Sequence, residues 1–317
     1  MIKYLLYPIT WLFTIIVYMR NALYDCNILP RINSKLPVIS VGNIQVGGTG
    51  KTPLVVSLAK KLIENNIKPL IITRGYKRNT THQIIFNNLE QYSAQEVGDE
   101  PYYMKQVLES VPMIIDYNKK KAVKIANQMD NIDCIILDDG FQSRYINKSL
   151  DIVLIDPYID KQLITLMPAG LLREPLSSLK RADFVYTKGK DHLAFNYQLH
   201  KYQNNNKEIV ENIIPSESFV AFCGIGNPKS FILELENNNI TIDKKIIFEN
   251  HANYNAKKYQ QLKNTNPNNL SFITTYKDFV KLNTEFKNTY TIYVLEMNLV
   301  LNDNRLLDKI KALISEN

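Results

Sequence analysis

The chain contains little histidine and little cysteine, with four residues of the first and three of the second among 317. No two histidines have the spacing H-x-x-x-H and the cysteines lack metal-ligand spacing, so we expect no zinc site. Nothing indicates a disulfide framework, which is typical of proteins in a reducing compartment. Cys134 and Cys223 lie inside apolar runs and are expected to be buried thiols.

The sequence also lacks internal repeats and an excess of acidic residues. No period of 20–50 residues occurs, which excludes a repeat protein. Lysine and arginine outnumber aspartate and glutamate by 38 to 31, which gives a formal net charge of +7. A basic chain suits an anionic partner: nucleic acid, an anionic membrane surface or a phosphorylated substrate. A solvated, lysine-rich surface gives the same charge balance.

The most informative segment is residues 41–53, VGNIQVGGTGKTP. It follows an apolar run typical of a buried strand and precedes residues 51–64, which have helical spacing. A strand, a glycine-rich turn and a helix form a phosphate cradle, in which Lys51 reaches the terminal phosphates and Thr52 can ligate Mg²⁺. Gln45 stands where the strict P-loop pattern has glycine. The nucleotide-binding residues expected from this segment are Gly47, Gly48, Thr49, Gly50, Lys51 and Thr52.

Apolar runs alternate with helical stretches along the first 190 residues. This alternation predicts an α/β fold with a P-loop NTPase-like, mainly parallel sheet and helices on both of its faces. After about residue 190 the composition changes. The polar run at 198–211 is typical of a connection between domains. We expect a nucleotide-binding kinase domain at residues 26–197, a linker at 198–212 and a second, smaller α/β domain at 213–317.

Residues 4–19 are an uncharged segment of 16 residues between Lys3 and Arg20. As a helix they would span about 24 Å, less than a hydrocarbon core of about 30 Å. Trp11 and three tyrosines favour an interface. We expect residues 1–25 to form a helix anchored in or on the membrane, with a buried core helix as the alternative. Because a nucleotide-binding domain needs cytosolic ATP, the remaining chain should face the cytoplasm.

Two pairs of adjacent carboxylates are candidates for chemistry. Asp138 and Asp139 end an apolar strand, and in P-loop proteins an aspartate at that place holds Mg²⁺ directly or through water. Asp99 and Glu100 precede Pro101, where either could instead cap a helix. A kinase needs a carboxylate that orients or deprotonates the acceptor hydroxyl, and Asp99 is a candidate for that base.

Two loops carry further charged residues. Residues 73–78, TRGYKR, follow an expected strand, at the carboxyl edge of the sheet where ligands bind. Arg74 and Arg78 could meet phosphate, and Tyr76 could stack on a sugar or acyl group, although a charged surface loop is equally consistent with the residues. Residues 168–175, PAGLLREP, form a second turn-rich loop with a charged pair.

These motifs, in this order, resemble the tetraacyldisaccharide 4′-kinase family, the lipid A 4′-kinases of Gram-negative bacteria. GGTGKTP, RGYKR, GDEP, DDGFQ and LREP together are far more specific than any one alone, and the matching stretches cover nearly the whole chain. The resemblance implies a lipid kinase that transfers the γ-phosphate of ATP to the 4′-hydroxyl of a tetraacyldisaccharide 1-phosphate, the lipid A precursor. It would make lipid IV-A at the cytoplasmic face of the inner membrane, with Mg²⁺.

The resemblance also implies roles for individual residues. Lys51 and Thr52 would bind the triphosphate and Mg²⁺, and Asp99 would act as base, with His251 pairing to it from the second domain. Glu100 and either of the two aspartates at 138 and 139 would complete the metal environment: Asp138 is expected as the ligand and Asp139 as a catalytic residue. Six residues would lie near the acceptor sugar or its phosphate: Arg74, Tyr76, Arg78, Gln142, Arg173 and Glu174.

The chain departs from the family pattern at Ser143, where histidine is usual, around His251, and at Tyr276, where glutamate is common. The alternative enzyme class is a membrane-associated P-loop NTPase of the metallochaperone or partitioning type, but Val46 stands where its signature lysine belongs. A non-enzymatic basic membrane or nucleic-acid binding protein would leave the phosphate loop unexplained. Nothing resembles a nucleic-acid module, and no obligate protein partner is evident.

Overall fold

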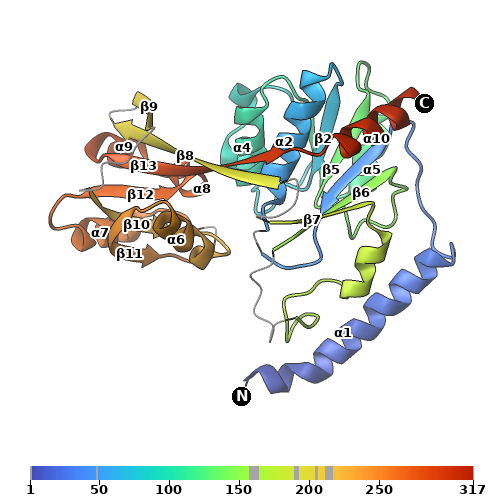
Figure 1. Cartoon of the computed structure of the whole chain (residues 1–317), viewed down its shortest axis with the longest axis horizontal. Helices are drawn as coiled ribbons and strands as arrows, with labels where there is room; N and C mark the ends of the chain where they lie inside the picture. The colour runs from blue at the N-terminus through green and yellow to red at the C-terminus, as the bar shows by residue number, and fades with distance from the viewer. Residues whose placement is uncertain are drawn as a thin grey trace. The chain divides into compact units, whose positions relative to one another are not determined.

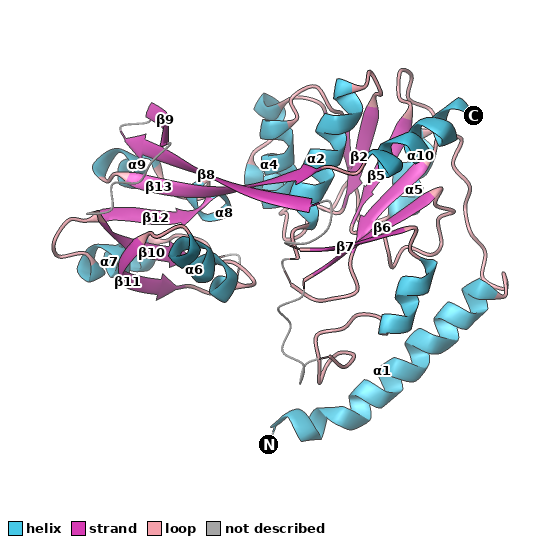
Figure 2. Cartoon of the chain, viewed as in Figure 1, coloured by secondary structure: helices cyan, strands magenta, loops and turns pink. Residues whose placement is uncertain are grey.

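The computed structural model describes residues 2–47, 49–156, 164–188, 193–203, 206–210, 217–250 and 252–316. The chain divides into two compact units, of which unit 1 is Met1–Phe195 with Leu299–Asn317 and unit 2 is Asn196–Asn298. Figures 1 and 2 show their elements. The chain leaves unit 1 within strand β8 (Leu193–Gln203) and returns to it within strand β13 (Ile292–Leu301).

Unit 1 contains a seven-stranded sheet with the order β3-β4-β2-β5-β1-β6-β7. All neighbours pair in parallel except β3, which is antiparallel to β4 at one edge. The strands are β1 (Val38–Gly42), β2 (Pro69–Thr73), β3 (Ile84–Phe86), β4 (Met113–Ile115), β5 (Cys134–Asp138), β6 (Leu150–Ile155) and β7 (Phe184–Thr187). Because β1, β2 and β5 are buried over their whole length, the sequence shows them as continuous apolar runs.

Helices cover both faces of this sheet, which confirms the predicted fold class. On one face, α2 (Lys51–Glu64), α4 (Asp99–Val107) and α10 (Asn304–Ser315) share a buried cluster with Ile39. On the other face, α5 (Lys119–Ala126) packs against Val38. Neighbouring residues of β1 therefore point to opposite faces. In its described residues, unit 1 also contains the short helices η1 (Leu89–Gln91), α3 (Ala94–Val97) and η3 (Leu176–Arg181).

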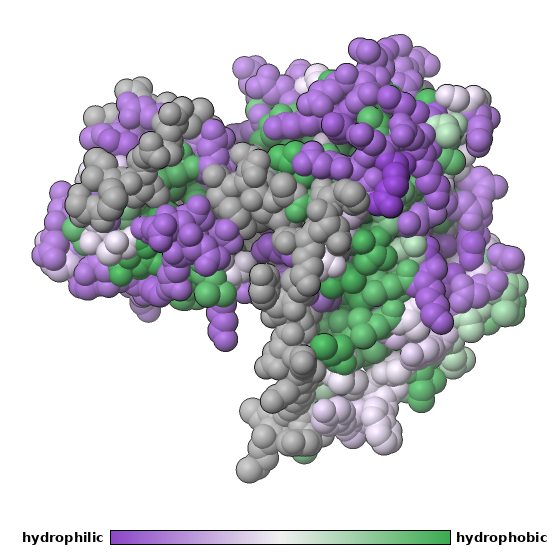
Figure 3. Space-filling model, viewed as in Figure 1, coloured by the Kyte–Doolittle hydropathy of each residue, from purple (hydrophilic) through white to green (hydrophobic). Residues whose placement is uncertain are grey.

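Helix α1 (Ile2–Asp25) is buried on one side and exposed on the other. Val17 packs with Ile44 and Phe141 of unit 1. The opposite side exposes large apolar side chains, namely Leu5, Ile9, Trp11, Leu12, Ile15, Ile16 and Met19. Figure 3 shows green and pale side chains where α1 lies. Within the described residues, no helix combines the length and the hydropathy needed to cross a membrane.

Unit 2 contains a six-stranded sheet with the order β11-β10-β12-β13-β8-β9. The strands β10 (Ser218–Cys223), β11 (Thr241–Ile247), β12 (Ser271–Thr275) and β13 run parallel, whereas β8 and β9 (Asn206–Val210) form an antiparallel pair. Its helices are α6 (Pro228–Asn237), α7 (Ala256–Thr265), α8 (Tyr276–Phe279) and α9 (Thr284–Thr289). Unit 2 is therefore also an α/β unit. The thiols of Cys134 and Cys223 are free and buried, as the sequence predicts.

Two expected boundaries differ from the structure. The linker expected at 198–212 contains most of β8 and all of β9, and Leu199 and Val210 pack into the core of unit 2. Polar side chains are usual on a strand at the edge of a sheet, so this hairpin has the composition of a linker. Residues 299–317 belong to unit 1 and not to the second domain, because Leu306 and Ile310 of α10 are buried in the core of the first sheet.

Candidate active site

The segment between β1 and α2 forms a turn with the backbone geometry of a phosphate-binding loop. Gly47 and Gly50 have φ angles of 109° and 96°, which side chains other than glycine rarely adopt. Gly50 is the N-cap of α2, so the helix begins at Lys51 and leaves its first N–H groups available for an anion. The Asn43 amide donates to Thr49 Oγ1 at 2.9 Å. Gly48 lies outside the described residues.

Gln45, the departure from the strict P-loop pattern, is buried and braces the loop. Its side-chain amide donates to Asp156 O at 3.0 Å, and its Oε1 accepts the Asp156 N–H at 2.9 Å. The next residue, Val46, donates its N–H to Leu171 O at 2.7 Å. Glutamine is therefore suited to this position, because its side chain fixes the start of the loop to the backbone of Asp156, directly after β6.

Asp139 lies between two cations directly after β5. Lys51 Nζ is 3.5 Å from its Oδ1, and Arg173 Nη1 donates to Oδ1 at 3.0 Å and to Oδ2 at 2.9 Å. Burial alone would raise the pKa of the Asp139 carboxyl, but the cations of Lys51, Arg173 and Lys119 hold it well below its usual range. Asp139 is therefore ionised at neutral pH and joins the lysine of the loop to Arg173.

Asp138 is the buried member of the pair. Its Oδ2 accepts the Thr73 hydroxyl at 2.8 Å. Burial, reinforced by the carboxylates of Glu100 and Asp139, raises the pKa of Asp138 to about 6. The carboxylates of Asp138 and Asp139, at the end of β5, and of Glu100, at the start of α4, thus repel one another.

Lys119 is a candidate that the sequence pattern does not single out. It is the first residue of α5, is 0% exposed, and its Nζ donates to the backbone carbonyl oxygens of Asp138 and Asp139. Burial lowers the pKa of Lys119 to about 8, against the opposing effect of the two aspartates. Lys119 begins a run of three lysines, which is typical of a solvated helix face. Only the position of Lys119 just after β4, at the carboxyl edge of the sheet, could have indicated a role in the site.

Two glycines let the loops at 73–78 and 97–100 touch. Gly75 has a φ of 64°, and a Cβ there would lie 2.5 Å from a carbonyl oxygen of the second loop. Gly98 has a φ of 97°, and a Cβ there would lie 3.1 Å from the Tyr76 carbonyl oxygen of the first loop. Asp99 is therefore the first residue of α4, directly beside the RGYKR loop. This position suits both a carboxylate in the first turn of a helix and a candidate base.

The three RGYKR residues expected at the acceptor differ in exposure. Arg74 is exposed and Tyr76 is 62% exposed, so both can be reached from solvent. Arg78 is only 6% exposed; it donates to Ile115 O at 3.2 Å, and its guanidinium lies 4.8 Å from the centre of the Tyr117 ring. Arg78 supports the loop from inside, which does not fit a direct contact with the acceptor.

Gln142 and Glu174 are also expected near the acceptor. Their side chains form hydrogen bonds with other residues of the protein. The Gln142 amide donates to Asn43 O at 2.8 Å and so ties the DDGFQ segment to the phosphate loop. Glu174 is 0% exposed, and both of its carboxylate oxygens accept hydrogen bonds from protein side chains. The expectation that Glu174 contacts the acceptor does not fit this burial.

His251 lies outside the described residues. The chain around it in unit 2 is held by Asp278, whose buried carboxylate accepts the Gly224 N–H at 3.0 Å and the Tyr254 hydroxyl at 2.9 Å. The structure thus brings together Lys51, Asp139 and Arg173, and places Glu100 near Asp138, while the expected pairing of Asp99 with His251 stays a prediction.

The donor set suits Mg²⁺. Hydroxyl and carboxylate oxygens are the ligands of this hard cation, and Thr52, Glu100 and Asp138 supply both kinds. The crowding of carboxylates around Asp138 is the condition that a divalent cation relieves. In the described ranges, no three His, Cys, Asp or Glu residues could hold a metal by themselves. Magnesium at a nucleotide is usually held by one or two carboxylates together with phosphates and water, so these residues fit it.

The whole chain is similar to proteins of known activity. A family model described as tetraacyldisaccharide-1-P 4′-kinase matches residues 2–315. The tetraacyldisaccharide 4′-kinase of Psychromonas ingrahamii is 35% identical over 88% of this chain and 86% of that protein. The tetraacyldisaccharide 4′-kinase of Halothermothrix orenii is 32% identical over 92% of this chain and 87% of that protein. A crystal structure of the "apo" form of LpxK from Aquifex aeolicus in complex with ATP aligns with a TM-score of 0.77 and 30% identity over 99% of both chains.

Proposed function

The chain belongs to the tetraacyldisaccharide-1-P 4′-kinase family, and from this premise we propose how its residues carry out the reaction. It is an ATP-dependent lipid kinase that transfers the γ-phosphate to the 4′-hydroxyl of a tetraacyldisaccharide 1-phosphate. The observation that carries the assignment of the site is Asp139, held between Lys51 and Arg173 at the carboxyl end of β5.

The phosphate loop and two cations receive the triphosphate. The N–H groups at the start of α2 and the backbone around Gly47 and Gly50 bind phosphate oxygens. Lys51 lies against the terminal phosphates while Asp139 limits where its Nζ can go. Arg173 adds positive charge beside the transferred group, where negative charge on the equatorial oxygens is stabilised.

Thr52, Glu100 and Asp138 are the residues that would hold Mg²⁺. When bound, the metal neutralises charge on the β- and γ-phosphates. Lys119 contributes from the other side of Asp138 and Asp139, because its hydrogen bonds to their carbonyl oxygens fix the backbone that carries both carboxylates.

Asp99 acts as the base at the acceptor. Its carboxylate takes the proton of the 4′-hydroxyl as the oxygen attacks the γ-phosphorus, and the bond to ADP breaks. The position of Asp99 beside the RGYKR loop supports this role, because exposed Arg74 and Tyr76 lie on that loop and can bind the sugar or its phosphate. His251 is the proposed partner of Asp99 in holding the proton.

The substrate carries four acyl chains, so the enzyme must reach it in a lipid layer. We assign this contact to α1, whose outer side exposes Trp11, Leu12 and Ile16. Burying one such side chain in an apolar phase stabilises the contact by roughly 1.5–3 kcal/mol. Several together are enough for an interfacial helix at the cytoplasmic face of the inner membrane.

A transfer assay tests this function directly. Purified protein and a Lys51→Ala variant are incubated in detergent with γ-labelled ATP, Mg²⁺ and tetraacyldisaccharide 1-phosphate. We expect label on the lipid with the parent protein and none above background with the variant. ATP hydrolysis without labelled lipid would contradict the assignment and favour a P-loop NTPase with a protein partner.

A further inference from the structure

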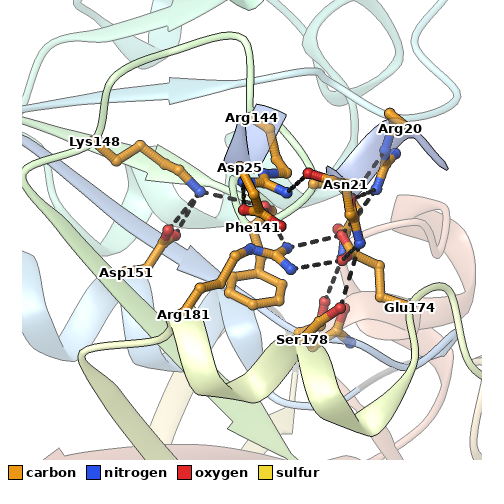
Figure 4. A network of polar contacts seen from close by, with 12 residues as sticks. Arg20, Asn21, Asp25, Phe141, Arg144, Lys148, Asp151, Glu174, Ser178 and Arg181 are labelled. Carbon is orange, nitrogen blue, oxygen red and sulfur yellow. Dashed lines mark hydrogen bonds and ion pairs between the residues drawn. The ribbon is translucent and has the colours of Figure 1, made fainter. Parts of the chain in front are cut away.

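Glu174 is a buried carboxylate whose two oxygens accept hydrogen bonds from two different helices. Its Oε2 accepts Asn21 Nδ2 at 3.1 Å and Arg181 Nη1 at 2.7 Å, and its Oε1 accepts Arg20 Nη2 at 3.2 Å and Arg181 Nη2 at 2.9 Å. Figure 4 shows these donors converging on one carboxylate from two sides. Two of the donors belong to α1 and the third to η3, so Glu174 joins the N-terminal helix to the body of unit 1.

The segment that carries Glu174 also carries a residue of the active site. Arg173, the preceding residue, grips both oxygens of Asp139 and donates its N–H to Ile44 O in the phosphate loop at 2.7 Å. On its other side, Arg181 donates to Phe141 O at 3.2 Å and lies 3.7 Å from the centre of the Phe141 ring. Phe141 follows Asp139 by two residues, so Glu174 is connected to Asp139 along two short routes.

Helix α1 has further attachments to the same part of the molecule. Arg144 donates to the Asn21 carbonyl oxygen at 2.8 Å and forms an ion pair with Asp25 (Figure 4). In the N-terminal half of the helix, Thr10 Oγ1 accepts the Ala169 N–H at 3.0 Å. The buried side of α1 is thereby held to the loop at 164–175, while its apolar side is exposed.

We propose that Glu174 is a positioning residue that couples α1 to the Arg173–Asp139 pair and so sets the rate of phosphate transfer. A buried charge is stable only when it is paired, and removing one partner leaves the others desolvated and unsatisfied. Without the carboxylate, Arg181 and Asn21 lose their shared acceptor, and the 173–181 segment relaxes away from Asp139. This inference depends on the proposed roles of Arg173 and Asp139.

Glu174→Gln tests the proposal, because glutamine keeps the size of the side chain but removes its charge. We expect kcat to fall about tenfold or more while the KM for ATP changes less than about twofold. In an Arg173→Ala background, the same substitution should change kcat by less than about twofold, because Glu174 acts through Arg173. Asn21→Ala removes one of the two contacts from α1 and leaves that of Arg20, and it should give the same pattern with a loss of about threefold to tenfold.

Asp303→Asn is the matched control, since Asp303 is also buried and paired with an arginine, Arg305, and a further side-chain partner, Tyr186, belongs to β7 and not to the phosphate loop. Both Glu174→Gln and Asp303→Asn should lower the Tm, but only the first should lower kcat when each is assayed well below its own Tm. An unchanged kcat in Glu174→Gln, or an equal loss with and without Arg173, would overturn the proposal. If Glu174→Gln does not fold, Asn21→Ala decides by the same comparison. Full activity of Arg173→Ala alone would instead contradict the proposed role of Arg173 in the active site.

Discussion

Arg173 holds the Asp139 carboxylate with Nη1, at 3.0 and 2.9 Å, and the phosphate loop with its backbone N–H, which donates to Ile44 O at 2.7 Å. One residue thus fixes the ends of two adjacent strands, β1 and β5. The Asp139 carboxylate is therefore held in place and can in turn fix the position of the Lys51 ammonium group. Arg173, which is predicted to lie near the acceptor sugar or its phosphate, therefore also holds the phosphate loop and Asp139.

Asp139→Asn should reduce kcat by about 10²-fold or more, because the uncharged amide cannot hold both Lys51 and Arg173 in place. Steady-state kinetics over a range of ATP concentrations measures this loss. Glu236→Gln removes one partner of an exposed ion pair with Lys245 in unit 2, and its kcat should stay within about twofold of the parent. Full activity of Asp139→Asn would show that the ion pair is structural.

Asp99→Ala should lower kcat by about 10²- to 10⁴-fold and leave the acceptor KM nearly unchanged, since a base acts mainly in the transition state. The acceptor is varied at saturating ATP to separate the two constants. Glu96→Ala provides a control on the same loop, because Glu96 only caps α3 through Ser93. A rise in the acceptor KM with no change in kcat would remove Asp99 as the base.

Lys119 should make the stability of the protein depend on pH in the alkaline range. Its pKa is about 8 in the folded state and near the ordinary 10.5 in the unfolded chain. Between these values the unfolded state binds more protons, so this residue makes the free energy of unfolding rise with pH, by at most about 1.4 kcal/mol per pH unit.

Urea unfolding of the parent and of Lys119→Met at pH 7.5, 8.5 and 9.5 measures this effect. Other titrating groups are common to both proteins, so the parent should gain stability relative to the variant as the pH rises. A difference that stays constant over this range would mean that the lysine keeps an ordinary pKa.

Leu12→Glu together with Ile16→Glu should weaken binding to vesicles by about tenfold or more, because each change removes an exposed apolar side chain and adds a charge to the outer side of α1. Co-sedimentation with vesicles that contain anionic phospholipid measures the binding. Leu233→Glu changes a similarly exposed leucine on α6 and serves as the control. Equal binding by all variants would exclude α1 as the membrane contact.

The sequence predicts the central strands of unit 1 and the phosphate loop because local signals are strong there. The apolar runs at 69–73, 134–138 and 184–187 predict strands with the bounds that β2, β5 and β7 have, and the periodic run at 51–64 predicts those of α2. The strand-end position of Asp138 and Asp139 follows from the same runs. Exposure could not be predicted in this way, and Arg78 and Glu174 are both buried by contacts with residues distant in sequence.

Other features depend on tertiary contacts that leave little local pattern. Lys119 is buried only because β5 brings two carbonyl oxygens to the start of α5. Residues 198–210 are composed mostly of polar residues, so the part of β8 that pairs with β9 gives little apolar signal in the sequence, and the pairing defines the strands there. Helix α10 has a well-formed apolar side, but the sequence cannot tell which of the two sheets that side covers.

The placement of α10 has a consequence for synthesis on the ribosome. The core of the nucleotide-binding unit is completed by Leu306, Leu307 and Ile310, and Leu301 donates its N–H to Ser57 Oγ of α2 at 3.2 Å. Domains generally fold in the order in which they emerge, yet here the unit that begins first closes last, after the whole of unit 2 has been translated. A premature stop shortly after unit 2 would therefore remove α10 and leave the core next to α2, the helix that follows the phosphate loop, incomplete.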